Sequence, residues 1–264
     1  MQRWNISRIR KVDEINSFGH GNFGIIAGPC SIEDYDSLYQ SAKILKEMGI
    51  KYLRGGAYKL RTSVHSFRGL GDSGILRLAR VGQELGLKTV SECTQIDKVD
   101  FMAKNIDVLV VGTRNMQNYP LLELLGKIDK PVILKRGMAA TYDEWMAAAE
   151  YIIENGNEQV ILCERGIRTF ETETRYTLDL SAIKVMQQKC GIPVIIDPSH
   201  AAGNRALVPS LAMASIAGGA DGLMIECCVN PCESICDADQ TIEPETLRSI
   251  INAVVDLRQH LNRI

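Results

Sequence analysis

Residues 132–166 read VILKRGMAATYDEWMAAAEYIIENGNEQVILCERG, and this stretch decides the fold. Its two ends, 132–135 and 160–163, are continuously apolar rather than alternating, which is typical of parallel strands covered on both faces. Between them the capping-box pattern T-Y-D-E begins a helical segment, 141–155, which ends before a glycine. The stretch therefore predicts a strand–helix–strand unit.

Apolar runs of this kind recur along the chain, separated by stretches with helical periodicity. The runs lie at 23–27, 52–54, 89–91, 108–111, 132–135, 160–163, 194–197 and 222–226. The clearest helical stretches lie at 34–48, 74–85, 141–155, 181–189, 208–217 and 243–262. We expect Ser31 to cap the first of these helices. A doubly wound open sheet shares this alternation, but eight runs favour an α/β fold with a single closed (β/α)8 barrel, a TIM barrel.

The length of the chain favours one domain. It has 264 residues, and an α/β barrel typically needs about 250. The residues before the first run are too few for a second domain, and no Pro/Gly/Ser linker or low-complexity tract divides the rest. We expect a short N-terminal extension, 1–20, followed by one catalytic barrel domain, 21–264, without a regulatory domain.

Composition and charge exclude several classes of protein. A hydrophobic content of 45% with 23% charged residues argues against disorder. A net charge of −2 argues against nucleic acid or an acidic membrane as the partner. The first residues, MQRWNISRIRKVDEIN, contain no apolar signal-peptide segment, and no apolar run approaches the ~18 residues of a membrane span. We expect a cytoplasmic protein with no membrane or nucleic-acid partner.

The chain has 8 cysteines. In a chain of this length without a secretory signal, we expect them to be free thiols. Cys228, Cys232 and Cys236 are evenly spaced but lack the paired C-x2-C ligands of structural zinc sites. We therefore interpret them as incidental loop thiols.

Basic residues gather where the apolar runs end, which in a barrel is the rim that carries the active site. They are Arg54, Lys59, Arg61, Arg114, Lys135, Arg136 and Arg165. Any one of them alone would be interpreted as a rim salt bridge or a solvated loop charge. Together, in a chain of net charge −2, they predict a site for phosphate or carboxylate groups, because guanidinium and ammonium groups match those oxygens.

A second set of polar residues follows the first, seventh and eighth runs, which become neighbours when a barrel closes. The set is Cys30, His200, Glu226 and Asp237. One thiolate, one imidazole and two carboxylates suit Mn2+, Fe2+, Zn2+ or Co2+. A buried Cys30 or a packed His200 would be unremarkable alone, so the metal hypothesis depends on their convergence.

Several motifs resemble those of one enzyme family. They are Ala27-Gly-Pro-Cys-Ser31, Gly55-Gly-Ala-Tyr-Lys-Leu-Arg-Thr-Ser63, Val111-Gly-Thr-Arg-Asn-Met-Gln117, Leu134-Lys-Arg-Gly137, Leu162-Cys-Glu-Arg-Gly-Ile-Arg168 and Asp197-Pro-Ser-His200. Together they are similar to type I 3-deoxy-D-arabino-heptulosonate 7-phosphate (DAHP) synthases, especially the Iβ branch, over nearly the whole chain. Lys59-Leu60-Arg61-Thr62 resembles the K-P-R-T of these enzymes, with Leu60 in place of proline. The sister octulosonate 8-phosphate synthases have a K-A-N-R-S type motif there.

The resemblance implies a role for each of these positions. It implies metal ligation by Cys30, His200, Glu226 and Asp237. It implies phosphoenolpyruvate binding by Arg54, Lys59, Thr113, Arg114, Lys135 and Arg165. It implies that Arg61 and Thr62 bind erythrose 4-phosphate, and that Lys59, His200 and Glu92 are catalytic, with Lys59 as the proton donor and Glu92 positioning water.

The implied reaction is a metal-dependent condensation of phosphoenolpyruvate with erythrose 4-phosphate and water, giving DAHP and phosphate in the shikimate pathway to aromatic amino acids. The implied metal is Mn2+, with Fe2+, Co2+ or Zn2+ as alternatives, and the implied assembly is a homo-oligomer, a dimer or a tetramer. Two other hypotheses remain: an octulosonate 8-phosphate synthase, which would use arabinose 5-phosphate, and a non-catalytic barrel that binds phosphosugars. A further hypothesis is that Cys30 and Cys236 form an inhibitory disulfide.

Overall fold

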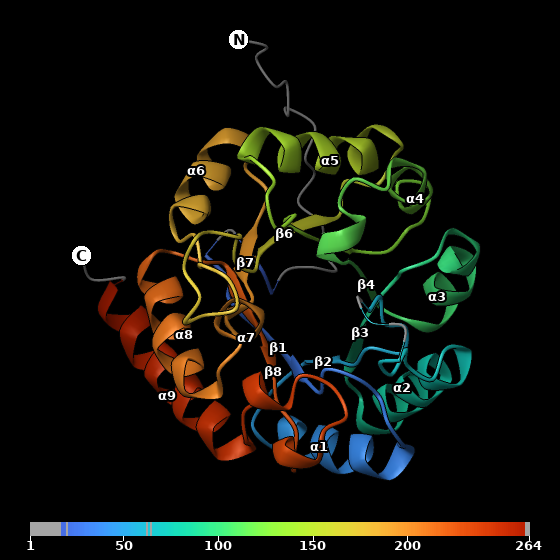
Figure 1. Cartoon of the computed structure of the whole chain (residues 1–264), viewed down its shortest axis with the longest axis vertical. Coiled ribbons are helices and arrows are strands. Elements are labelled where there is room, and N and C mark those ends of the chain that lie inside the picture. Colours follow the sequence, from blue (N-terminus) through green and yellow to red (C-terminus); the bar gives the residue numbers. More distant parts are fainter. Residues whose placement is uncertain (1–16, 20, 62, 64, 262–264) are drawn as a thin grey trace.

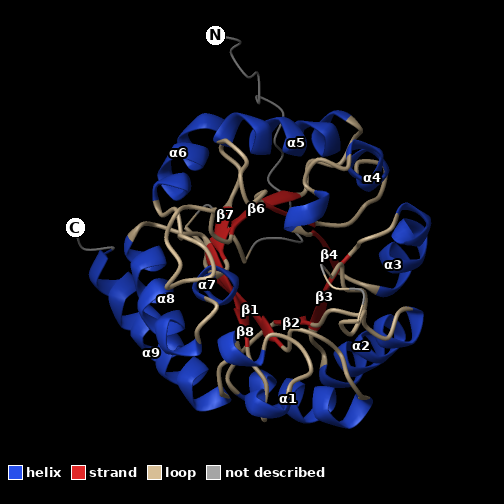
Figure 2. Ribbon diagram, in the orientation of Figure 1, coloured by secondary structure: helices blue, strands red, loops and turns tan. Residues whose placement is uncertain are grey.

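The computed structural model describes residues 17–19, 21–61, 63 and 65–261. Within this part of the chain, strands β1 to β8 form a closed barrel in sequence order. All neighbouring strands are parallel, and the barrel closes where β1 (Gly24–Gly28) pairs with β8 (Gly222–Glu226) along its whole length. Helices surround the barrel on its outside (Figures 1 and 2). The predicted (β/α)8 barrel is confirmed.

The remaining elements alternate around the barrel as the sequence predicts. The other strands are β2 (Tyr52–Arg54), β3 (Lys88–Glu92), β4 (Val108–Val111), β5 (Val132–Lys135), β6 (Val160–Glu164) and β7 (Val194–Ile196). The helices are α1 (Tyr35–Glu47), α2 (Asp72–Leu85), α3 (Val99–Asn105), α4 (Tyr119–Leu125), α5 (Tyr142–Glu154), α6 (Ser181–Cys190), α7 (Pro198–Ala202), α8 (Val208–Ala217) and α9 (Pro244–Leu261). Short 3-10 turns are η2 (Ile96–Lys98), η3 (Thr113–Asn115), η4 (Arg205–Leu207), η5 (Pro231–Glu233) and η6 (Ala238–Gln240).

Two apolar layers hold the barrel together. The larger layer lies between strands and helices and includes Leu53, Leu109 and Trp145, all fully buried. The smaller layer is built of side chains such as Ile26, Ile133 and Ile195. Every strand except β3 contributes to both layers, which is why these strands read as continuously apolar in the sequence. β3 supplies only Val90, to the smaller layer, and its alternate residues Thr89 and Ser91 are polar.

The N-terminal end of the barrel is closed by Phe18, one of the few described residues of the expected extension. Its ring is buried and packs against the ring of Tyr52 in β2, with the ring centres 5.2 Å apart and the ring planes tilted by 51°. A Cβ atom at Gly24 would lie 2.4 Å from the Phe18 ring, so only glycine fits there. The smaller apolar layer is therefore sealed at this end, and open space for ligands is left at the opposite end.

The predicted caps are partly correct. Thr141 and Glu144 form the expected capping box at the start of α5. Ser31 is not the cap of α1, and that prediction is wrong: Asp34 caps the helix, and its side chain accepts a hydrogen bond from the Ser37 backbone at 2.8 Å. Asp34 is the cap because its carboxylate reaches the backbone N–H of the third helical residue. Ser31 lies too early in the chain and forms a β-bridge with Gly56 instead.

Most predicted boundaries agree within one or two residues, with one difference that affects the site. The seventh run was expected to reach 197, but β7 ends at Ile196 and Asp197 caps the short helix α7, accepting from the His200 backbone at 3.0 Å. Among the described helices, none combines the length and apolar character needed to cross a membrane.

Candidate active site

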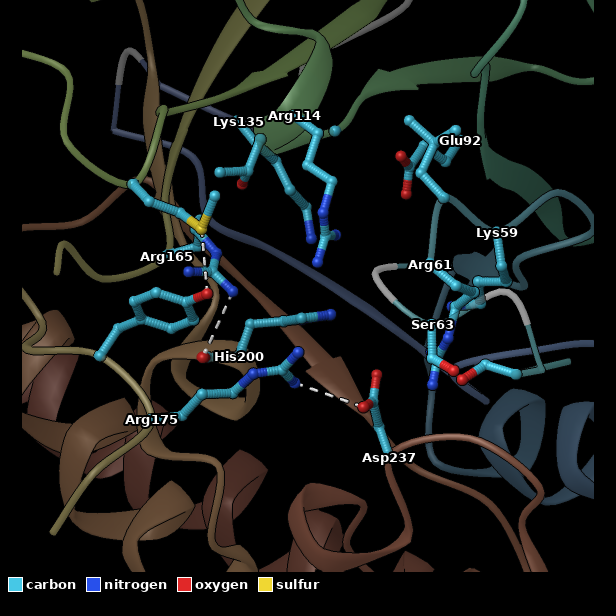
Figure 3. A pocket seen from close by; sticks show the side chains of 16 residues that line it. Lys59, Arg61, Ser63, Glu92, Arg114, Lys135, Arg165, Arg175, His200 and Asp237 are labelled. Atoms are coloured by element: carbon cyan, nitrogen blue, oxygen red, sulfur yellow. Dashed lines mark hydrogen bonds and ion pairs between the residues drawn. The ribbon is translucent and has the colours of Figure 1, made fainter. Parts of the chain in front are cut away.

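A polar cavity of about 280 Å3 lies at the C-terminal ends of the strands. It is lined by Lys59, Leu60, Arg61, Ser63, Ser66, Glu92, Gly112, Thr113, Arg114, Lys135, Met138, Arg165, Arg175, Tyr176, His200 and Asp237. Figure 3 shows Arg114 and Lys135 pointing into this space, with Arg61 approaching from the β2–α2 loop. The cavity thus gathers most of the predicted site residues; Thr62 lies outside the described residues.

The four predicted metal ligands converge beside this cavity. We call Cys30, His200, Glu226 and Asp237 the donor cluster, because one ligand atom from each lies within 4.8 Å of the others. The His200 Nε2 atom is 3.5 Å from Glu226 Oε1, and the Cys30 thiol lies 3.0 Å from Asp237 Oδ2. These residues are far apart in the sequence, but they follow or end β1, β7 and β8, which are neighbours in the closed barrel. Their convergence agrees with the prediction.

The chemistry of the donor cluster fits a divalent transition metal. Thiolate, imidazole and carboxylate donors together suit Mn2+, Fe2+, Co2+ or Zn2+. Glu226 Oε1 is fully buried, and the Arg54 guanidinium, although 3.1 Å away, donates no aligned hydrogen bond to it. A metal ion in the cluster would satisfy this oxygen. In addition, carboxylate oxygens and the Cys30 sulfur already lie close together in this cluster. Positive charge stabilises such an arrangement.

Lys59 reaches the donor cluster from the β2–α2 loop. Its Nζ atom lies 2.8 Å from the Cys30 sulfur. Burial lowers the pKa of the Lys59 ammonium, but the nearby Cys30 and Glu226 outweigh burial and raise it above its usual value. Lys59 therefore carries a proton at neutral pH in a position to donate it into the site.

The Cys30 thiol lies in an environment that opposes ionisation. Burial raises its pKa well above the usual value, and the Glu226 carboxylate adds to this effect more than Lys59 offsets it. Since a metal binds the thiolate rather than the thiol, a cation at this cluster would displace the proton from Cys30.

His200 is held in place by a buried carboxylate that was not assigned a role from the sequence. Its Nδ1 atom lies 2.8 Å from Asp197 Oδ2, which leaves Nε2 facing Glu226. Asp197 is fully buried, yet His200 and Lys135 outweigh that burial and keep the pKa of its carboxyl well below the usual range. A carboxylate behind a histidine in this way fixes the ring orientation of a metal ligand.

The predicted anion-binding residues lie at two depths. Arg114, Lys135 and Arg165 line the main cavity. Arg54 lies below it, with Lys59, in a smaller adjoining space, and its guanidinium is 3.1 Å from Glu226 Oε1. Lys135 also contacts Asp197 at 2.6 Å. Two of the expected substrate-binding cations are therefore also partners of the donor cluster and of the carboxylate behind His200.

Arg165 is the cation that burial penalises most clearly. Burial lowers the pKa of its guanidinium, and Asp197 and Tyr176 only partly compensate. Its guanidinium carbon lies 4.0 Å from the centre of the Tyr176 ring, on whose face it stacks. Among the described residues no carboxylate forms an ion pair with Arg165, so this buried guanidinium is well suited to a ligand anion.

Glu92 can enter the cavity because the residue just after the next strand, Gly112, has no side chain. A Cβ atom at Gly112 would lie 2.0 Å from Glu92 Oε1, so any larger residue would displace this carboxylate. Glu92 ends β3 and lines both the main cavity and the smaller one below. Glu92 therefore lies in the cavity wall, while its position near a substrate and its role in placing water stay predictions.

Arg136 does not belong to the site, and its inclusion among the anion-binding cations is wrong. Its guanidinium contacts Glu164 at 3.0 Å and Asp179 at 2.9 Å, outside the cavity. The preceding residue, Lys135, points into the barrel, and successive side chains of a strand point to opposite faces. Because side chains alternate between the two faces at the end of β5, Lys135 points into the cavity and Arg136 points to the outer side of the barrel.

Several residues that line or support the cavity were not predicted, among them four from the loops. Arg175 and Tyr176 come from the long loop between β6 and α6, Met138 follows β5, and Gln240 lies in η6. The unusual length of that loop is the one available signal, because long loops at the rim often carry function. The thiols of Cys30 and Cys236 are both free in the structure, and the disulfide hypothesis stays a prediction.

Known proteins resemble this chain in sequence over nearly its whole length. A family model described as the DAHP synthetase I family matches residues 9–263. The phospho-2-dehydro-3-deoxyheptonate aldolase of Thermotoga maritima is 43% identical over 243 residues, which are 92% of this chain and 72% of that protein. The 2-dehydro-3-deoxyphosphooctonate aldolase of Desulfosudis oleivorans is 30% identical, with 94% of this chain and 95% of that protein covered.

Solved structures agree with the sequence comparisons. The crystal structure of the Thermotoga maritima DAHP synthase superposes with a TM-score of 0.90 at 42% identity, covering 92% of this chain and 72% of that one. A truncated form of the Thermotoga maritima enzyme superposes with a TM-score of 0.86 at 40% identity, covering 92% of this chain and 89% of that one.

Proposed function

Since the chain belongs to the DAHP synthetase I family, we propose that it condenses phosphoenolpyruvate with erythrose 4-phosphate and water to give DAHP and phosphate. This is the first reaction of the shikimate pathway. The observation that carries the proposal is the meeting, at one cavity, of the donor cluster with Lys59 and three inward-facing cations.

Phosphoenolpyruvate is a small, highly charged anion, so its binding requires several cations in a water-poor space. Arg114, Lys135 and Arg165 supply this charge from three neighbouring strands, β4, β5 and β6, and Thr113 adds a hydroxyl beside them. Arg54 and Lys59 complete the set from β2 and its loop. We assign these residues to phosphoenolpyruvate, because Thr113, Arg114 and Arg165 line the main cavity, Arg54 lines the smaller space below, and Lys59 and Lys135 line both.

The aldose phosphate enters from the other side of the cavity. Arg61 and Ser63 face this space from the β2–α2 loop (Figure 3). We assign Arg61 to the phosphate of erythrose 4-phosphate and propose Thr62, which lies outside the described residues, as its neighbour in that role.

Cys30, His200, Glu226 and Asp237 would hold a divalent metal, for which we propose Mn2+. When bound, such an ion supplies Lewis acidity to an aldehyde oxygen. His200 takes part in catalysis through its ring nitrogen Nε2, which Asp197 keeps directed at the cluster.

Proton transfer falls to Lys59 and Glu92. Carbon–carbon bond formation turns the aldehyde oxygen into an alkoxide, and the Lys59 ammonium, whose pKa is raised by Cys30 and Glu226 against the effect of burial, donates a proton to it. Water then adds to C2, and the C2–O bond to phosphate breaks, so that the water oxygen becomes the ketone oxygen. One proton of the water leaves with phosphate and the other restores the Lys59 ammonium. Glu92 lies across the cavity from the donor cluster and accepts a hydrogen bond from that water.

The assay that tests this function follows phosphate release from phosphoenolpyruvate with erythrose 4-phosphate or with arabinose 5-phosphate, each with Mn2+ or with a chelator. We expect turnover with erythrose 4-phosphate alone and its loss on chelation. Turnover with arabinose 5-phosphate alone would assign the octulosonate reaction instead, and substrate binding without any turnover would indicate a non-catalytic barrel.

The assembly and location of the enzyme are further proposals. We propose a homo-oligomer, a dimer or a tetramer, that acts in the cytoplasm without a membrane or nucleic-acid partner. Light scattering of the purified protein measures the first, and a monomeric mass at micromolar concentration would contradict it.

A further inference from the structure

The Gln240 side chain is buried beside the donor cluster and uses both ends of its amide. It lies in η6, three residues after Asp237, with 2% of its surface exposed. Its Nε2 atom donates a hydrogen bond to Glu226 Oε2 at 2.5 Å. Its Oε1 atom accepts one from Arg175 at 2.9 Å. One uncharged residue therefore joins a carboxylate of the cluster to a cation of the cavity wall.

Arg175 extends this connection to the second carboxylate. The NH1 atom that donates to Gln240 lies 3.3 Å from Asp237 Oδ1, and Figure 3 shows the Arg175–Asp237 contact at the edge of the cavity. Glu226, Gln240, Arg175 and Asp237 thus form one continuous chain of contacts. The chain links β8, the loop after β8 and the loop after β6.

Each carboxylate has one oxygen in this chain and the other directed to the donor cluster. With Oε2 held by Gln240, Glu226 turns Oε1 toward the cluster, 3.5 Å from His200 Nε2 and 3.1 Å from the Arg54 guanidinium. With Oδ1 held by Arg175, Asp237 keeps Oδ2 for the cluster, 3.0 Å from the Cys30 sulfur. The contacts therefore select the ligating oxygen on both residues.

The backbone at Asp237 requires such support. Among the described residues it is the one non-glycine with a positive φ, at 53°, a conformation that an L-residue adopts at a cost. The backbone N–H of Gln240 donates a hydrogen bond to the backbone carbonyl of Asp237 at 3.2 Å. Both the backbone and the side chain of Gln240 therefore hold the segment that presents Asp237.

We propose that Gln240 is a positioning residue which, through Arg175, fixes the ligating oxygens of Glu226 and Asp237. The inference rests on the metal site of the proposed function. Gln240 itself contacts neither metal nor substrate, and its removal lowers metal affinity by letting the two carboxylates rotate. Outer contacts of this kind typically contribute about 10–100-fold in metal affinity.

The test measures Mn2+ affinity of the metal-free protein by electron paramagnetic resonance of the free ion, which needs no turnover. We expect Gln240→Met, which preserves bulk but no hydrogen bond, to weaken Mn2+ binding about 10–100-fold. Gln240→Asn, whose amide is one methylene too short, is the second variant in case the first does not fold, and we expect it to weaken binding in the same direction.

Gln187→Met is the matched control. Gln187 in α6 also donates to a carboxylate, Asp221, at 2.8 Å and to the Gly219 carbonyl at 3.0 Å, but just before β8, at the opposite end of the barrel. We expect this variant to lose stability without losing Mn2+ affinity. Equal Mn2+ affinity in folded Gln240→Asn, Gln187→Met and the unchanged protein would overturn the inference.

A double-mutant cycle with Arg175→Met tests the connection between the two residues. Because Gln240 and Arg175 act in one chain of contacts, their effects on Mn2+ affinity should not add, and the double variant should bind much as the weaker single variant does. Strict additivity would overturn the role of Arg175. If the unchanged protein binds no Mn2+, the metal site of the proposed function fails, and the inference fails with it.

Discussion

Two clusters of charged side chains lie at the same rim of the barrel, yet they differ in how completely their polar atoms are paired. The donor cluster faces the cavity and contains the buried oxygen Glu226 Oε1, to which Arg54, although 3.1 Å away, donates no aligned hydrogen bond. The second, which we call the Arg136 cluster, consists of Arg136, Tyr142, Glu164 and Asp179 and lies behind the strands.

The Arg136 cluster is fully paired among its own members and the backbone. Arg136 contacts both carboxylates and donates to the Ala140 carbonyl at 3.0 Å. Tyr142 donates to Asp179 at 2.7 Å. A paired cluster has no capacity left for a ligand, so charge at a barrel rim indicates function only where pairing is incomplete.

The largest effect should follow from removing Lys59, the proton donor that lies beside the donor cluster. Lys59→Met deletes an ammonium that a general acid requires, and such groups contribute about 10²–10⁴-fold to rate. We expect kcat for DAHP formation to fall by that factor while the thermal unfolding curve barely moves. A kcat within threefold of the unchanged enzyme would remove Lys59 from the mechanism.

The next effect concerns stability and should be confined to the Arg136 cluster. Arg136→Met leaves Glu164, which is fully buried, without its cation, and breaking a buried pair from one side costs about 3–5 kcal/mol. We expect the free energy of unfolding in urea to fall by that amount. The kcat/KM of the fraction that remains folded should stay unchanged, and a specific loss of phosphoenolpyruvate affinity would show that Arg136 serves the site after all.

The same substitution one strand further should give the opposite result. Arg165→Met removes a stacked, cavity-facing guanidinium. A hydrogen bond to a charged group contributes about 1.5–3 kcal/mol, or roughly 10- to 150-fold in affinity. We expect the KM for phosphoenolpyruvate to rise by that factor with little change in unfolding. Unfolding at lower urea with an unchanged KM would place Arg165 with the structural cations.

The smallest effect is a pH dependence of the Arg136 cluster. Burial alone would raise the pKa of the Asp179 carboxyl, but hydrogen bonds from Tyr142 and Arg136 hold it below the usual value. The ionised carboxylate therefore stabilises the fold above its unfolded pKa of about 3.9, and this contribution is lost as the pH falls through the folded pKa.

Asp179→Asn removes that contribution at every pH. We expect it to unfold with roughly 1 kcal/mol less free energy than the unchanged protein near neutral pH, and the difference should shrink below about pH 4. Glu164 is present in both proteins, so its own titration largely cancels in the comparison. A difference that stays constant down to the acid transition would contradict the ion-pair account.

Much of the fold was predictable because strand and helix signals alternate so regularly. Continuous apolar runs, the capping box at Thr141 and the count of eight strands lead directly to the barrel. The short helix α7 was missed because it is only one turn long and begins with Asp197-Pro198, which reads equally well as the end of a strand.

The site was predictable where residues follow strands closely, and less so where loops decide. Cys30, His200 and Glu226 end or follow strands whose order in the barrel fixes their neighbours. Arg175 and Gln240 lie in loops whose path depends on side-chain contacts, which no local pattern encodes. Arg136 was misassigned because proximity to a strand end does not say to which face a side chain points.

The most direct test of the central claim is an anomalous difference map, recorded at the manganese edge from crystals grown with Mn2+ and phosphoenolpyruvate. We predict one strong peak among Cys30, His200, Glu226 and Asp237, and none at the Arg136 cluster. An absent peak at the donor cluster, or a peak elsewhere at the rim, would contradict the claim that incomplete pairing marks the functional cluster.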